Sequence, residues 1–145
     1  MVQQLLIATD GSEASCRAVE QGLGFARALG AKALVVRVSG TPAHIVILGV
    51  DITELPEAVK SEIAKRIEAH FAWVRKTAAD LGVSCETLRV ESEHPWQGIL
   101  ETAENRGAEL IVMASHGRRG RAARLIGSET IRVLTNGKLP VLVLT

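Results

Sequence analysis

The sequence contains little cysteine, and its metal-binding side chains are widely spaced. Cys16 and Cys85 are the only cysteines among 145 residues, and neither belongs to a CxxC or similar metal-ligand spacing. One disulfide between them stays an alternative, but the pattern favours two reduced, partly buried thiols. The four histidines are also scattered, and none stands four residues from another. The sequence therefore predicts no metal site.

An excess of charge of one sign is also missing. Lys and Arg total 17 against 16 Asp and Glu, a formal net charge of +1, which gives no support for binding to nucleic acid or to an acidic membrane surface. No apolar run approaches the roughly 18 residues of a membrane span. The opening MVQQLLIATDG is too short and too lightly charged for a signal peptide. We therefore expect a cytoplasmic protein without nucleic-acid or membrane partners.

The motifs of two large classes of nucleotide enzyme do not occur. The phosphate-binding loop of kinases and ATPases, GxxxxGK followed by Ser or Thr, is absent. The dinucleotide fingerprint GxGxxG fails because Gly22 and Gly24 fall inside a predicted helix, with Arg27 in place of the third glycine. No nucleophile stands beside a base in a convincing arrangement, so the sequence predicts no catalytic residue.

The chain does contain enough apolar residues for one folded domain. Hydrophobic residues make up 47% of it, which argues against disorder, and its length predicts a single domain over residues 1–145. Apolar runs predict four strands, at Gln4–Ala8, Ala33–Val38, Glu109–Ala114 and Pro140–Leu144, and the alternating pattern of Ser84–Val90 predicts a fifth. Helical periodicity predicts helices that begin near Cys16, Pro56, Pro95 and Ser128 and end at Gly30, Gly82, Gly107 and Gly137.

This alternation predicts an α/β fold with a doubly wound, Rossmann-like parallel sheet. The strands are nearly continuous apolar runs, which indicates burial on both faces by helices. Glycine after each helix is typical of a left-handed terminal residue. In the second helix we expect an apolar face from Val59 and Ile63 to Leu81. Ser39–Leu55 carries little pattern and predicts a long surface connection.

Two segments at predicted strand ends have the chemistry of a ligand site. In such sheets, ligands bind outside the carboxyl ends of the strands. Ala8-Thr9-Asp10-Gly11-Ser12 follows the first strand, and Ala114-Ser115-His116-Gly117 follows the fourth. From there the chain continues through four arginines to Gly127-Ser128, where the start of a helix favours an anion. From the residues alone, Ser128 can equally be a helix cap, and either Asp10 or Ser12 can cap the first helix.

The second segment resembles the ATP-binding pattern of universal stress proteins. That pattern is Gly, two residues, Gly, nine residues, Gly, then Ser or Thr. Here it reads Ala114, two residues, Gly117, nine residues, Gly127-Ser128. The opening LLIATDGSEAS, the stretch GAELIVMASHG and the closing LPVLVLT extend the similarity along the chain. Ala114 replaces the first glycine, and if that position needs positive φ the replacement costs about 1–2 kcal/mol.

The resemblance implies a five-stranded sheet of order 3-2-1-4-5, a homodimer and bound ATP, with Mg²⁺ as the companion of the triphosphate. It implies that Asp10 faces the nucleoside, the Val38 backbone the adenine, and the amides of Gly117, Gly127 and Ser128 the ribose and phosphates. The full set of residues that it places at the nucleotide is Ala8, Thr9, Asp10, Val38, Met113, Ala114, His116, Gly117, Gly127, Ser128, Glu129 and Thr130.

These observations predict an ATP-binding stress-response regulator that acts through nucleotide-dependent conformation or partner binding, with at most slow ATP hydrolysis. Because Ala114 interrupts the glycine pattern, a nucleotide-independent interaction module of the same fold is the alternative. Separately from the resemblance, the closing strand at Pro140–Leu144 is an apolar sheet edge, which favours a homodimer paired along it.

Overall fold

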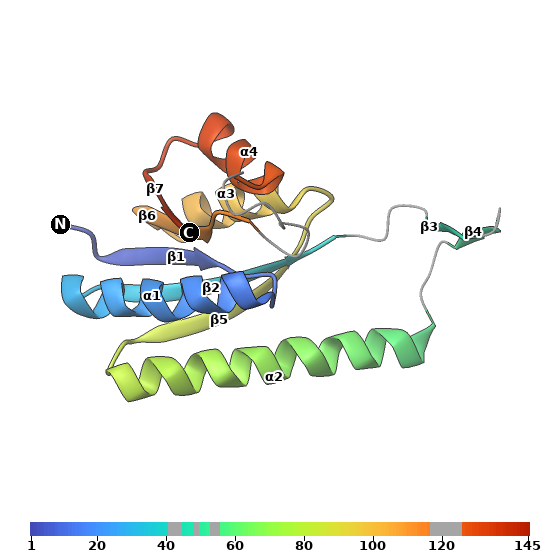
Figure 1. The fold of residues 1–145 in the computed structure, drawn as a ribbon, viewed down its shortest axis with the longest axis horizontal. Coiled ribbons are helices and arrows are strands. Elements are labelled where there is room, and N and C mark those ends of the chain that lie inside the picture. The colour runs from blue at the N-terminus through green and yellow to red at the C-terminus, as the bar shows by residue number, and fades with distance from the viewer. Residues whose placement is uncertain (41–44, 48–49, 53–55, 117–125) are drawn as a thin grey trace.

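The computed structural model describes residues 1–40, 45–47, 50–52, 56–116 and 126–145. A five-stranded, fully parallel sheet forms the centre of the molecule, in the order β5-β2-β1-β6-β7 (Figure 1). Its strands are β1 (Gln4–Ala8), β2 (Lys32–Ser39), β5 (Cys85–Glu91), β6 (Leu110–Ala114) and β7 (Val141–Leu144). The predicted order 3-2-1-4-5 is therefore confirmed, and the strand limits differ from the predicted ones by about one residue.

Helices cover both faces of the sheet (Figure 1). They are α1 (Glu13–Leu29), α2 (Glu57–Leu81), α3 (Pro95–Asn105) and α4 (Ser128–Asn136). Within β1, Leu5 and Ile7 pack with α1 and α2, whereas Leu6 and Ala8 pack with α3 and α4. Successive side chains of a strand point to opposite faces, so a strand that is apolar at every position serves two cores at once.

Part of the predicted connection Ser39–Leu55 has regular structure, which corrects that prediction. Ser39 ends β2, and the short strands β3 (Ile45–Ile47) and β4 (Val50–Ile52) pair antiparallel with each other and not with the main sheet. The residues of both strands are mostly β-branched, which favours extended backbone. Gly40 is exposed, and residues 41–44, 48–49 and 53–55 of this connection lie outside the described ones.

The predicted apolar face of α2 is wrong for its first turns. Val59 and Ile63 are 42% and 36% exposed, whereas Ile67, Phe71, Val74 and Ala78 are buried. In Figure 1 the first turns of α2 extend beyond the end of the sheet, so only the later turns have strands to cover. Periodicity therefore identified the helix but not the length of the sheet beneath it.

Three of the four predicted glycine stops have the expected left-handed conformation. Gly30 and Gly82 are left-handed caps of α1 and α2, and Gly107 has φ +69° just after α3. Gly137 differs, with an extended backbone at φ −90°, so the left-handed prediction is wrong there. A Cβ at Gly137 would lie 2.8 Å from the carbonyl oxygen of Val133. Close packing, not positive φ, favours glycine at this position.

No helix in the described part of the chain combines the length and the apolar character that crossing a membrane requires. Cys16 and Cys85 are both free and half-buried, as expected for two thiols. Burial raises the pKa of the Cys85 thiol to about 11.

We expect Gly98→Ala to destabilise the fold by about 1–2 kcal/mol, because a Cβ there would lie 2.9 Å from Cγ1 of Val38 and 3.1 Å from Cβ of Ser92. Gly24→Ala is the matched control, since it is also inside a helix but nothing lies within 4 Å. The control should gain about 0.5–1 kcal/mol from helix propensity. Urea unfolding measures both, and equal effects would contradict the packing role of Gly98.

Candidate functional site

The candidate residues gather at the carboxyl edge of the three central strands. β2, β1 and β6 lie side by side and end at Ser39, Ala8 and Ala114. The segments that follow β1 and β6 therefore start from neighbouring strand ends, with Val38 near the end of β2 beside them. Gly117 lies outside the described residues, as do Arg118, Arg119, Arg121 and Arg124. All other predicted site residues are placed by the structure.

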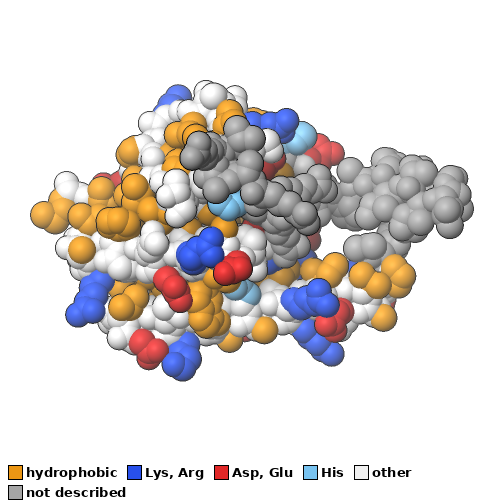
Figure 2. All heavy atoms as spheres, in the orientation of Figure 1, with side chains coloured by type: hydrophobic (Ala, Val, Ile, Leu, Met, Phe, Trp, Pro, Cys, Tyr) orange, Lys and Arg blue, Asp and Glu red, His pale blue; other side chains and the backbone are white. Residues whose placement is uncertain are grey.

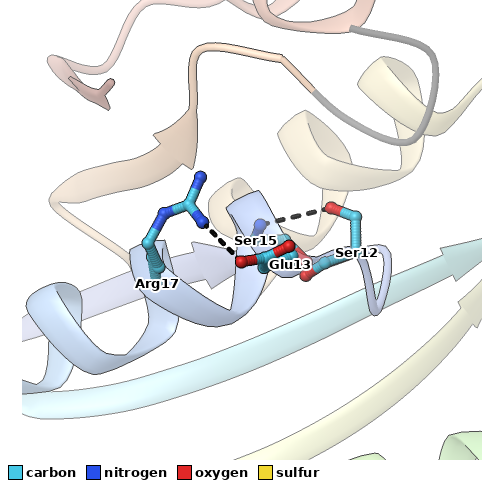
Figure 3. Close-up of polar contacts among 4 residues, drawn as sticks. All are labelled: Ser12, Glu13, Ser15 and Arg17. Carbon is cyan, nitrogen blue, oxygen red and sulfur yellow. Dashed lines mark hydrogen bonds and ion pairs between the residues drawn. The ribbon is translucent and has the colours of Figure 1, made fainter. Parts of the chain in front are cut away.

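After β1 the chain makes a tight turn into α1. Gly11 has φ +78°, and the Asp10 carboxylate accepts a hydrogen bond of 2.9 Å from the Ser12 N–H. The Ser12 hydroxyl in turn accepts from the Ser15 N–H at 3.2 Å (Figure 3). Ser12 is thus the N-cap of α1, which settles the two alternatives for this cap. Asp10 lies two residues before this cap, half-buried at the strand end.

The first turn of α1 also carries an ion pair between Arg17 and Glu13 at 3.2 Å (Figure 3). The Glu13 side chain is 91% exposed. Solvent therefore screens this pair, which contributes little to stability. Asp10 and the Ser12 cap, not this pair, define the shape of the turn.

Two hydrogen bonds join the start of α4 to the end of β6 and form the second side of the site. The Thr130 hydroxyl donates to the Ala114 carbonyl at 3.0 Å, and the Gly127 N–H donates to the Ser115 carbonyl. The N-cap of α4 is Gly127, and Ser128 is its exposed first helical residue. The cap alternative for Ser128 is therefore wrong.

Ala114 itself belongs to strand β6, where it pairs with Leu144. Its backbone is extended, a conformation that any residue adopts, so alanine meets no left-handed strain here. The cost that positive φ would impose at this position does not apply. Met113, just before it, is buried in the core that α3 and α4 share.

Glu129 has a partner that sequence reasoning missed. Its carboxylate accepts a hydrogen bond of 2.8 Å from the backbone N–H of Trp96, in the first turn of α3. The N-termini of α3 and α4 therefore lie close together, joined by this one side chain. A carboxylate is favourable at both positive helix ends. No spacing in the sequence could reveal the contact, because 33 residues separate its partners.

His116 is held by its neighbour. The Ser115 hydroxyl lies 3.0 Å from Nδ1 of His116, and Ser115 is only 5% exposed. This buried serine therefore fixes the orientation of the imidazole. Among the described residues, no group of three or more His, Cys, Asp or Glu side chains is arranged to hold a metal ion.

A second residue that sequence reasoning missed reaches the site from α2. Nε2 of His70 lies 2.9 Å from the Thr9 hydroxyl, directly beneath the turn that carries Asp10. Thr9 is 6% exposed and thus supports the turn from inside the protein.

Comparison with known proteins finds relatives along the whole chain. Residues 1–145 match the universal stress protein family. The universal stress protein MJ0531 of Methanocaldococcus jannaschii is 31% identical over 144 residues, which cover 99% of this chain and 82% of that protein. The universal stress protein YxiE of Bacillus subtilis is 27% identical over 147 residues, with 99% of each chain covered.

Solved structures share the fold. The hypothetical protein MJ0577 of Methanocaldococcus jannaschii superposes with a TM-score of 0.84 at 24% identity, covering 99% of this chain and 96% of that one. A universal stress protein in complex with cAMP gives a TM-score of 0.70 at 26% identity, with the same coverage. A universal stress protein of Archaeoglobus fulgidus in complex with dAMP gives 0.68 at 18% identity, covering 100% and 98%.

We expect Thr130→Val to lower the free energy of unfolding by about 1 kcal/mol, because the buried valine cannot donate to the Ala114 carbonyl. Thr135→Val, on the same helix, is the control: Thr135 is exposed and its hydroxyl bonds only within α4 and to the adjacent Asn136 side chain. The control should change stability by less than about 0.5 kcal/mol. Chemical denaturation measures both, and a neutral Thr130→Val would show that the tether between α4 and β6 contributes nothing.

Proposed function

The chain belongs to the universal stress protein family, and we propose that residues 1–145 act as one cytoplasmic domain that binds ATP at the carboxyl edge of its sheet. Binding serves regulation: the nucleotide changes the conformation or the partner choice of the protein in a stress response. Slow hydrolysis of ATP is the most catalysis that the proposal includes, since Ser115 is buried and His116 is held by it.

The observation that carries the proposal is the meeting of two helix N-termini and two strand ends. α1 and α4 both begin beside the adjacent ends of β1 and β6. Asp10 supplies a half-buried carboxylate for ribose hydroxyls, and the exposed Ser128 supplies a hydroxyl and amide for phosphate. Val38 offers its backbone to the adenine, and Mg²⁺ accompanies the triphosphate.

Two related structures support a nucleotide as the ligand class. One universal stress protein was solved in complex with cAMP and another in complex with dAMP. Both ligands are adenine nucleotides with one phosphate, so they support the nucleoside half of the proposal more directly than the triphosphate half.

One observation favours the alternative of a nucleotide-independent interaction module. The Glu129 carboxylate lies at the N-termini of α3 and α4, where it already occupies the positive end of both helices. A triphosphate placed against α4 must overcome that negative charge. The alternative therefore rests on Glu129 rather than on Ala114.

We expect ATP to raise the melting temperature, because a ligand that binds only the folded state stabilises it by about 2.7 kcal/mol at 100 times its Kd. Thermal unfolding with ATP, AMP and Mg²⁺ measures the shift. Asp10→Ala and Ser128→Ala should each reduce it, whereas Asp80→Ala, which removes an exposed partner of Lys76, should leave it unchanged. The absence of a shift with every nucleotide at millimolar concentration would favour the interaction module.

We further propose a homodimer that pairs residues 140–144 of two chains. β7 ends the sheet, and its four residues are only half-buried. Ile131 and Leu134 on the neighbouring α4 add exposed apolar surface, at 45% and 44%. Pairing the edge with a second copy would remove both an open row of backbone groups and part of this apolar surface.

The register of β7 offers a selective test. The Pro140 carbonyl accepts from Ile111 in β6 and the Leu144 carbonyl from Ser115 just after it, so the alternate residue Val143 directs its own N–H to the open edge. Val143→Pro should therefore preserve the fold and give a monomer, with Val143→Ala as the dimeric control. Light scattering at micromolar concentration measures the mass. A monomeric mass for the unaltered protein would overturn the dimer.

A further inference from the structure

A chain of hydrogen bonds beneath the Asp10 turn connects three elements of the fold. His70 on α2 contacts Thr9, after β1, through Nε2 at 2.9 Å, and Cys16 on α1 through Nδ1 at 3.9 Å. Thr9 and Ser15 join their hydroxyls at 3.0 Å, and both are almost fully buried, at 6% and 4% exposed. The residues that the resemblance places at the nucleotide include neither His70 nor Ser15.

Only one arrangement of protons satisfies every contact from the Ser12 carbonyl through Ser15 and Thr9 to Nε2 of His70. The Ser15 hydroxyl has one proton, which it donates to the Ser12 carbonyl at 3.0 Å. Thr9 must then donate to Ser15, and Nε2–H of His70 must donate to Thr9. Nδ1 of the neutral ring is left to accept from the Cys16 thiol. The network thus places a hydrogen on Nε2 of His70, and the lowered pKa of the ring leaves Nδ1 without one at neutral pH.

The two hydroxyls in the chain hold the backbone on both sides of Asp10. The Asp10 N–H donates to the Ser15 hydroxyl and the Gly11 N–H to the Thr9 hydroxyl, each at 3.3 Å. The remaining lone pairs of the Thr9 and Ser15 hydroxyls accept these bonds, because the protons of both hydroxyls are already donated within the hydrogen-bond network. His70 therefore sets the direction of the hydroxyls that shape the Asp10 turn, without itself reaching the outer surface of the site.

The surroundings of the ring oppose its protonation. Burial lowers the pKa of His70, and the positive charge of Arg37 on β2 lowers it further, while Asp10 acts in the opposite direction. Burial also raises the pKa of the Cys16 thiol, with added contributions from Asp10, Glu20 and Glu13, so the thiol keeps the proton that Nδ1 accepts. The Trp73 ring stacks on the imidazole, with 5.6 Å between the ring centroids and 25° between the ring planes.

We propose that His70 is a positioning residue for the nucleotide: its neutral ring holds the Thr9–Asp10 turn in the shape that binds the nucleoside. This inference rests on the proposed nucleotide function and adds to it a residue from a different helix. On protonation, Nδ1 gains a hydrogen that faces the Cys16 thiol, and the ring carries a positive charge that attracts the Asp10 carboxylate. Asp10 then turns toward His70 and away from the ligand, and affinity falls.

The test compares variants of the chain by calorimetric titration with cAMP, whose phosphodiester does not titrate across the histidine range. At about pH 7.5, His70→Leu and Thr9→Val should each weaken cAMP binding roughly tenfold, because each removes one hydrogen-bonding group of the network beneath the Asp10 turn. His70→Gln retains an amide donor toward Thr9 and should bind within about threefold of the unaltered protein. Thr77→Val, which removes a hydroxyl bonded only to the Trp73 carbonyl on α2, is the matched control.

The pH profile separates positioning from simple structural support. Since the His70 pKa in the folded protein lies below its ordinary 6.5, the neutral ring persists at neutral pH, and affinity should fall only as the pH drops through that lowered pKa. The stability of the unaltered protein should fall at higher pH than its affinity does, from about pH 6.5 down to the lowered pKa, because in that window the unfolded chain binds the proton more readily. His70→Gln should keep its affinity at neutral pH and should not show this acid limb, the loss of affinity at low pH.

The outcomes are distinct. If the unaltered protein binds neither cAMP nor ATP, the proposed function fails and the positioning role fails with it. If it binds and His70→Leu binds equally well but melts lower, His70 is only structural: this inference is overturned and the proposed function stands. Retention of the acid limb in His70→Gln, or a rise in affinity at acid pH, would likewise overturn the role of the neutral ring.

Discussion

Strand β1 is buried on both of its faces and between two neighbours, and the candidate site depends on that burial. Leu5, Leu6 and Ile7 are fully buried, and they alternate between two cores that hold different helix pairs. Because β2 and β6 flank β1 in parallel, all three end at the same edge, and the helices that follow must start there. The position of Asp10 at the same sheet edge as the start of α4 is thus a consequence of where apolar side chains lie several residues earlier.

The same burial explains why the hydroxyls beneath the Asp10 turn, those of Thr9 and Ser15, are fully hydrogen-bonded. Thr9 and Ser15 lie where water does not reach, and an unpaired hydroxyl there would cost about 1–3 kcal/mol. The chain from Cys16 through His70 to the Ser12 carbonyl gives every one of these groups a partner. A network in which each proton has one direction is rigid, so the turn is formed before any ligand arrives.

The sequence was sufficient for those features that depend on local pattern. The five strands, their order, the limits of α3 and α4 and the gathering of the strand-end segments follow from apolar runs, helix stops and a family resemblance. The contacts of His70 with Thr9 and of Glu129 with Trp96 did not follow, because they join residues 61 and 33 positions apart. Such contacts depend on how helices pack, and periodicity carries no information about that. The exposed start of α2 was missed for the same reason, since it depends on where the sheet beneath it ends.

In this chain, Glu129 opposes the proposed nucleotide binding more than Ala114 does. The alanine that interrupts the glycine pattern is an ordinary strand residue, so backbone strain does not weaken the site. Glu129 instead places a negative charge between the positive ends of α3 and α4, and its bond to Trp96 satisfies a group that a phosphate would otherwise meet. A phosphate at α4 must compete with this carboxylate, whereas a nucleoside at Asp10 meets a turn that the His70 chain has already shaped. In the proposed function, the turn at Asp10 favours recognition through the nucleoside, and Glu129 weakens the contribution that the start of α4 makes to phosphate binding.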